Sequence, residues 1–108
     1  GNIEWTAGGA VTIKDNVVEK GKSFSVEARV QSRNKPIEDG VLIFKIYEDG
    51  KETPNDILYQ YASEIDRTGL AVLNFNTTRT IIYKIEVEYI GILGYQNSKT
   101  NKYTVEVQ

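Results

Sequence analysis

Apolar and polar side chains alternate along most of this chain, and that period of two restricts its fold more than any other feature. The pattern is clearest where every second residue is apolar, at Phe24, Val26, Ala28 and Val30. A strand with one buried and one solvated face produces this pattern. Similar runs recur, separated by turn-forming residues at intervals of about 8–12 residues, and no segment shows the period of a helix. We therefore predict an all-β fold, an antiparallel β-sandwich or small barrel of about seven strands.

The chain is long enough for one domain with one core. Its 108 residues match a domain of ordinary size, which needs no disulfide or metal to stabilise it. Residues 1–9 are rich in glycine and lack a period, so we interpret them as a lead-in or interdomain linker, with Trp5 packed over an edge of the domain. The sandwich is expected over residues 10–108. Because the chain begins at Gly1 and lacks methionine, we expect a fragment or processed product.

Composition excludes several classes of chemistry. The chain contains no histidine and no cysteine, which removes the usual ligands of zinc, haem and iron–sulfur clusters and the usual nucleophile–base pairs. Its net charge of −2 provides no basic field for a nucleic acid. No apolar run approaches the roughly 18 residues of a membrane-spanning helix. We expect no cofactor, no metal, no nucleic-acid partner and no membrane insertion by this segment.

The acidic residues favour solvated positions over catalysis. Hydrolysis by two carboxylates needs a facing pair in a cleft, whereas Glu27, Glu86 and Glu88 occupy the expected outward faces of strands. Acids in turns, such as Asp49 before Gly50, fit the capping of tight turns. No loop has the spacing of acids that wraps a calcium ion. We therefore expect a non-enzymatic protein.

Several short motifs resemble those of bacterial immunoglobulin-like (Big) domains. They lie in the segments VEKGKSFSVEARV, IEDGVLIFKIYEDGKE, RTGLAVLNF and YKIEVEYIGILGYQNS. The positions that fit the family pattern are Gly40, Leu42 and Phe44 of a central strand, Gly69 and Ala71 of a hairpin, Tyr83 two residues before Ile85, and Tyr89, Gly91, Tyr95 and Ser98 of a closing turn. The resemblance covers about residues 10–108. Ile92 departs from it, because the family usually has Asp at that place.

The resemblance implies an immunoglobulin-like antiparallel β-sandwich of about seven strands, with Tyr83 buried and its hydroxyl bonded to the main chain. Domains of this family mostly occur in tandem in large adhesins and other surface proteins of bacteria and archaea. There they commonly form stalks, and some bind sugars or proteins. The implied location is extracellular or at the cell surface, and the implied partners are neighbouring domains of the same polypeptide.

Three functions are open on these grounds. The first is a non-enzymatic structural or spacer module of a microbial cell-surface or secreted adhesin-like protein. The second is a module that binds a surface glycan or a protein. The third is an accessory domain of a secreted glycoside-processing enzyme. We favour the first.

Two groups of residues are candidates for contact with a ligand or a neighbouring domain. Tyr59 and Tyr61 share one face of a strand, where an exposed aromatic pair can stack on sugar rings, and the inner face of the sandwich is at least as good a place for them. Ile92, Leu93 and Tyr95 lie in a connection that must cross the surface, so they either cap the core or form a contact patch. For this second group we favour core capping or interdomain contact over a ligand site.

Two covalent modifications have weak support in the sequence. Lys14 and Asn101 are the pair that could form an isopeptide bond across the sandwich, as some surface immunoglobulin-like domains do. However, Lys14 alternates with Ile13 and is expected to point outward. Asn76 begins the one Asn-x-Ser/Thr motif, in a predicted loop, and is a candidate for glycosylation if the protein is exported.

Overall fold

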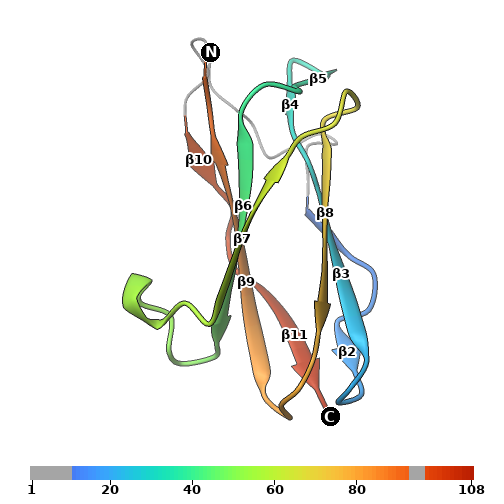
Figure 1. The fold of residues 1–108 in the computed structure, drawn as a ribbon, viewed down its shortest axis with the longest axis vertical. Coiled ribbons are helices and arrows are strands. Elements are labelled where there is room, and N and C mark those ends of the chain that lie inside the picture. Colours follow the sequence, from blue (N-terminus) through green and yellow to red (C-terminus); the bar gives the residue numbers. More distant parts are fainter. Residues whose placement is uncertain (1–10, 93–96) are drawn as a thin grey trace.

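Eleven short strands and one turn of 3-10 helix make up the computed structural model, which describes residues 11–92 and 97–108 (Figure 1). The strands are β1 (Val11–Ile13), β2 (Val17–Val18), β3 (Ser23–Arg29), β4 (Gln31–Ser32), β5 (Lys35–Pro36), β6 (Val41–Glu48), β7 (Tyr59–Glu64), β8 (Leu70–Asn76), β9 (Ile82–Ile90), β10 (Ser98–Lys99) and β11 (Tyr103–Val107). The helical turn η1 spans Pro54–Asp56, between β6 and β7.

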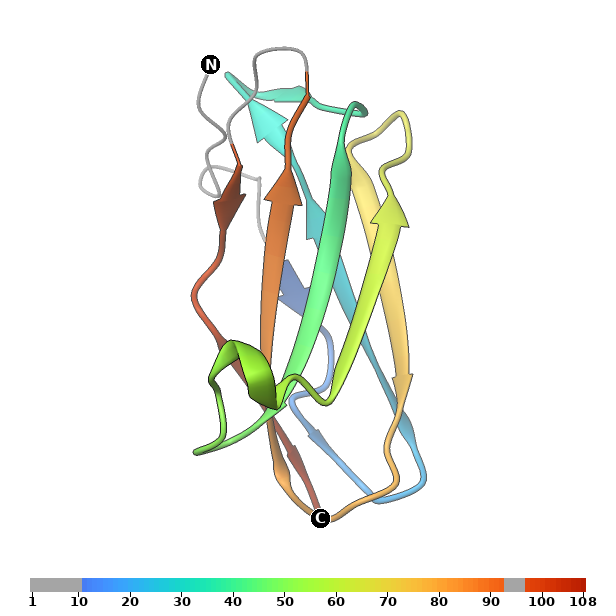
Figure 2. The same ribbon diagram turned by 60° about the vertical axis from the view of Figure 1, so that its left-hand side comes forward.

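Two sheets face each other, and a small hairpin lies beside them. The smaller sheet has the order β1-β3-β8, and the larger sheet has the order β2-β11-β9-β6-β7 with β10 paired to the C-terminal part of β9. The hairpin is formed by β4 and β5. Among the described strands, β2 and β11 pair in parallel and all other pairs are antiparallel. Figure 2 shows the smaller sheet lying behind the larger one. The predicted all-β, antiparallel sandwich is confirmed.

The core lies between the sheets and is built from the residues that the alternation predicts. From the smaller sheet it takes Phe24, Val26 and Ala28, which are at most 2% exposed. The facing residues of the larger sheet include Leu42, Phe44, Ile46, Ile85, Val87, Tyr89 and Val105. Because these β-branched and aromatic side chains alternate with polar ones, each strand buries one face and leaves the other to solvent.

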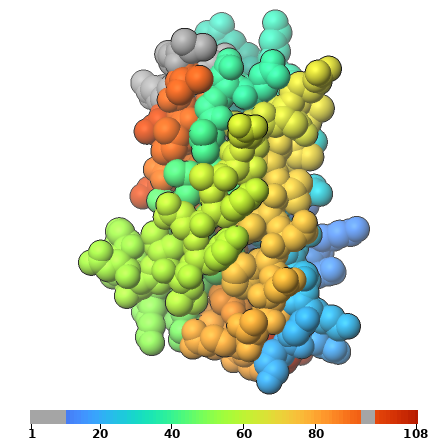
Figure 3. All heavy atoms as spheres, viewed as in Figure 1, coloured from blue at the N-terminus to red at the C-terminus, as the bar shows by residue number. Residues whose placement is uncertain are grey.

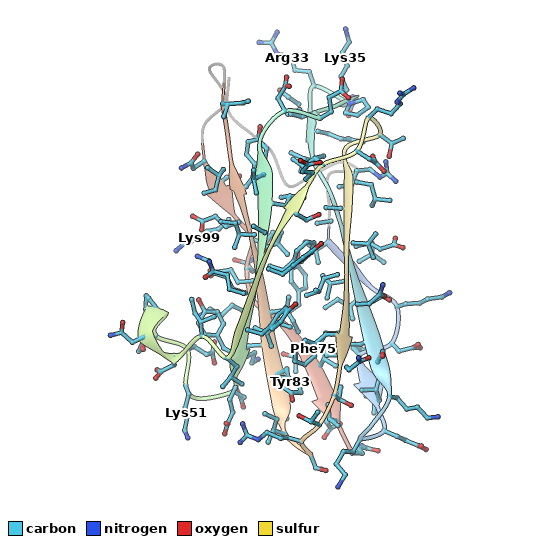
Figure 4. All side chains as sticks on the ribbon, viewed as in Figure 1. Arg33, Lys35, Lys51, Phe75, Tyr83 and Lys99 are labelled. Atoms are coloured by element: carbon cyan, nitrogen blue, oxygen red, sulfur yellow. The ribbon has the colours of Figure 1, made fainter. Side chains whose placement is uncertain are left out.

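The resemblance implied that Tyr83 is buried and donates a hydrogen bond to the main chain. In the structure, these two features belong to two different tyrosines of β9. Tyr83 is buried, as predicted, and its ring centre lies 5.4 Å from that of Phe75 on the facing sheet (Figure 4). The hydrogen bond from a tyrosine hydroxyl to the main chain, predicted for Tyr83, is made by Tyr89, which donates to the carbonyl of Asp39 over 2.7 Å. Within the described residues, no hydrogen bond joins the Tyr83 hydroxyl to the main chain. That part of the prediction was wrong.

The pairing of the last segment with β9 is interrupted, and one side chain fills the interruption. β10 pairs with β9 at Ser98 and Lys99, and β11 resumes the pairing at Tyr103. Between them, the amide of Thr100 donates to the carbonyl of Val87, and the Thr100 hydroxyl accepts from the Val87 amide over 3.0 Å. Since Val87 is fully buried, this hydroxyl satisfies an amide that water cannot reach.

Candidate functional site

Tyr59 and Tyr61 lie on β7, at the open side of the sandwich. Their rings point toward the facing sheet. The Tyr59 ring centre lies 5.3 Å from that of Phe75 on β8, and the Tyr61 ring stacks on Phe44 at 6.4 Å. Because β7 is an edge strand, these rings are covered on one side only and remain 40% and 41% exposed. We call Tyr59, Tyr61 and Phe75 the β7–β8 seam, and Figure 3 shows the atoms of β7 lying directly against those of β8.

The seam combines the two alternatives that the sequence left open. The tyrosines belong to the inner face, since each packs against a ring of the core or its margin. They are also a surface, since about two fifths of each side chain is exposed. A ring held on one side by packing keeps its orientation, so the seam presents a fixed aromatic strip to whatever approaches this side.

The connection after β9 also begins with an exposed apolar residue. Ile92 is 50% exposed, so it does not cap the core. The Gly91 amide donates to the side-chain oxygen of Asn97 over 2.9 Å, which closes the base of this connection. Leu93 and Tyr95, predicted to share a patch with Ile92, lie outside the described residues, as do Trp5 and the predicted lead-in at residues 1–9.

The outer face of the smaller sheet is mostly polar. A groove of about 420 Å³ is lined by Thr12, Lys14, Ser25 and Glu27. Lys14 is exposed there, as predicted, and Asn101, the other residue considered for an isopeptide bond, is exposed between β10 and β11. The glycosylation candidate Asn76 is the last residue of β8 rather than part of a loop, and its exposed side chain accepts a hydrogen bond from Ser23.

The outer face of the larger sheet carries paired charges. Lys45 donates to Glu88 over 2.8 Å and lies 4.0 Å from Glu86. The hydrogen bond to Glu88 raises the pKa of Lys45, and partial burial opposes that rise. Both carboxylates therefore serve as partners of a lysine. The predicted solvated position of Glu86 was wrong, because this residue is 8% exposed.

A second lysine fastens the connection between β6 and β7 to the same face. The Lys102 ammonium lies 3.3 Å from a carboxylate oxygen of Glu52 and 4.9 Å above the centre of the Tyr47 ring. Tyr47 points outward from β6 yet is 3% exposed, and this burial raises the pKa of its hydroxyl. Lys102 therefore covers part of the outer face of β6 at Tyr47.

The last residues of the chain pair with β2. β2 runs parallel to β11, with Val17 opposite Glu106 and Val18 opposite Val107. Three main-chain hydrogen bonds flank this pair: Glu106 N to Asn16 O at 2.9 Å, Gln108 N to Val18 O at 2.8 Å and Lys20 N to Gln108 O at 2.8 Å. The alternation of Val11 and Ile13 with polar residues indicates a single short first strand, but the chain crosses after Ile13 from the smaller sheet to the larger one to make this contact.

The described residues contain neither a cluster of metal ligands nor a membrane-spanning helix. Among residues 11–92 and 97–108, no three or more acidic side chains are grouped so that they could hold a metal ion. No helix in those two segments is long and apolar enough to span a bilayer. Compared with known proteins, the chain matches no protein-family model and no curated protein.

Proposed function

We propose that the chain is an immunoglobulin-like spacer module of a microbial cell-surface or secreted adhesin-like protein, without enzymatic activity. In this role it is mechanical. It separates neighbouring domains of the same polypeptide and transmits tension between them. The observation that carries the proposal is the parallel pairing of β2 with β11. This pairing determines how the fold resists a force applied to its two ends.

Tension along the polypeptide loads the β2–β11 contact in shear. Both strands run toward the same end of the molecule, where the chain ends at Gln108 (Figure 1). A pull on the segment before β2 draws that strand away from this end, and a pull at Gln108 draws β11 toward it. The three flanking hydrogen bonds lie across the direction of sliding, so they resist together rather than one after another. A spacer under load needs this property.

The connectivity supports the immunoglobulin-like assignment. The N-terminal strands are divided between the sheets, with β1 in the smaller and β2 in the larger. The chain then passes to β3, back to β6, and crosses again at β8 and β9. With a long dimension of 40 Å, one such module sets a substantial step between the domains on either side.

Force spectroscopy on tandem copies of the chain tests the proposal. Lys20→Pro removes the amide that donates to Gln108, at a turn position where proline is favoured, and should lower the unfolding force. The matched control is Leu73→Ala in the core, which should cost about 2–5 kcal/mol of stability while leaving those hydrogen bonds in place. The proposal predicts that Lys20→Pro lowers the unfolding force more than its loss of stability in urea explains. If the unfolding forces of the two variants fall in proportion to their losses of stability, the β2–β11 contact is not the element that bears load.

The other two functions, a module that binds a glycan or a protein and an accessory domain of a secreted glycoside-processing enzyme, remain predictions. Saturable binding on a glycan array that is lost on Tyr59→Ala would favour a carbohydrate-binding module over a spacer. The same loss with a protein ligand would favour a protein-binding module.

A further inference from the structure

One side of the sandwich exposes two strands with almost no charge. The seven residues 57–63 carry no ionisable acid or base at neutral pH, and neither do residues 70–76, although 26% of the chain is charged. The large apolar side chains exposed on these segments are Leu58, Tyr59, Tyr61 and Val72. β7 is the edge of the larger sheet and β8 the edge of the smaller one. On this side, each sheet therefore has an edge that is free of charge except for Glu64, the last residue of β7.

The two edges of the larger sheet differ in a way that sequence composition explains. The edge at β2 has two residues and is flanked by Asp15 and Glu19. Short edges with adjacent charges resist pairing with other chains. The edge at β7 has six residues, pairs with β6 without a break in register, and contains no proline or lysine. Its outward main-chain groups are of the kind that an added β-strand satisfies.

We propose that two copies of this chain associate through β7, in antiparallel pairing about a twofold axis at Tyr61. In this register Gln60 faces Ala62 of the second copy, and Tyr59 faces Ser63 of the second copy. No position of the pair joins like charges, which would oppose it. A twofold contact satisfies both free edges at once and uses the same surface on each copy.

The exposure of Tyr61 supports a second copy as the occupant. Its ring is stacked on Phe44 of the same molecule, and the residue is 41% exposed. Residues directly opposite each other in an antiparallel pair bring their side chains within about 4.5–5.5 Å on one face. The axis would thus place the two Tyr61 rings together, and the row would run from Phe44 through both tyrosines to Phe44 of the second copy. The exposed sides of the rings would cover each other.

The contact is lateral, so it goes beyond the spacer role. Domains joined end to end through their termini leave the β7 edge accessible. Two such polypeptides could then associate side by side through each copy of the module.

Sedimentation equilibrium of the purified chain, from low micromolar to about millimolar concentration, tests the proposal. The wild-type chain is expected to show a reversible monomer–dimer equilibrium. Gln60→Lys with Ala62→Lys places lysines opposite each other across the axis, at positions exposed in the monomer, and should raise the dissociation constant by about tenfold or more. Gln60→Lys with Ala62→Glu places opposite charges there and should restore the dimer.

The control adds the same two charges elsewhere. Thr12→Lys with Val17→Lys alters exposed positions away from β7 and should dimerise as the wild-type chain does. Circular dichroism and urea unfolding establish that each variant is folded. A wild-type chain that stays monomeric at all concentrations overturns the proposal, as does undiminished dimerisation of the double-lysine variant. If the Lys/Glu variant is monomeric, the twofold axis at Tyr61 is wrong.

Discussion

The hydroxyl of Tyr89 donates a hydrogen bond of 2.7 Å to the main-chain carbonyl of Asp39, and so ties the end of β9 to the start of β6. Gly40 makes this approach possible. Its φ is +102°, and a Cβ placed on it would lie 2.8 Å from the Tyr89 hydroxyl oxygen and 2.6 Å from the carbonyl oxygen of Ile90. The glycine is therefore required both for its backbone conformation and for the space it leaves.

Replacing Tyr89 by phenylalanine should lower the free energy of unfolding by about 1 kcal/mol, because it removes that hydrogen bond and keeps the ring. Urea unfolding measures the change. Tyr83→Phe is the matched control on the same strand, and a smaller change is expected because its hydroxyl has no main-chain acceptor among the described residues. If Tyr83→Phe lowers the free energy of unfolding as much as Tyr89→Phe does, the Tyr89 hydroxyl has no special role and the prediction is contradicted.

Removing the hydroxyl of Thr100 should be more costly. Thr100→Val keeps the shape of the side chain but leaves the buried Val87 amide without its acceptor, a loss of about 1–3 kcal/mol. Thr100→Ser retains the hydroxyl and should recover most of the stability. Hydrogen exchange at the Val87 amide should be fast in the valine variant only. Equal protection of that amide in both variants would show that the hydroxyl is dispensable.

Asp66 makes stability depend on pH in the acid range. Its carboxylate accepts hydrogen bonds from the hydroxyl of Thr68 at 2.6 Å and from the amides of Thr68 and Leu70 at 2.7 and 3.0 Å. The bond from the Thr68 hydroxyl is the largest cause that lowers the pKa of Asp66, followed by that from the Leu70 amide. This turn connects β7 to β8.

A pKa lower in the folded than in the unfolded chain gives a stabilisation that is complete above the unfolded value, about 3.9, and is lost as the pH falls through the folded value. Asp66→Asn keeps the acceptor oxygen and removes the ionisation. The difference in urea midpoint between wild type and Asp66→Asn should be largest near neutral pH and shrink below about pH 4. A difference that stays constant into the acid range would contradict this role.

The sequence predicted those parts of the fold that depend on local alternation. Phe24, Val26 and Ala28 face the core as their spacing indicates. The first half of β6 reads as apolar on both sides, and β6 does lie inside the larger sheet, between β9 and β7. A period of two indicates which face of a strand is buried, and this signal alone is enough to predict the core residues of these strands.

Long-range pairing was beyond the reach of that signal. The first strand divides at Ile13 and its second part joins β11, far along the chain. The hairpin at Arg33 and Asn34 takes positive φ at two non-glycine residues, 52° and 63°, although Pro36 and Gly40 are typical of an irregular loop. Both side chains of the hairpin that Figure 4 labels, Arg33 and Lys35, point away from the sandwich. Tight turns of this kind favour glycine, asparagine and aspartate, so an arginine at the first position gives no sequence signal for the turn.

The candidate site was predicted in its residues but not in its geometry. Tyr59 and Tyr61 were singled out because they share a face, yet the pattern cannot tell an inner strand from an edge strand. Their half exposure follows from the position of β7 at the edge of the larger sheet. Phe75, which completes the seam, gave no signal of its own, because its strand alternates like any other.

The direction of pull gives the most direct test of the load-bearing role of β2 and β11. The chain has no cysteine, so Glu19→Cys provides a unique attachment point beside Gln108. Pulling between this thiol and the C-terminus peels the two strands apart from one end, whereas pulling between the N- and C-termini shears them. We predict a markedly higher unfolding force for the end-to-end pull. Equal forces in the two directions would contradict the proposal that this module bears tension through the β2–β11 pair.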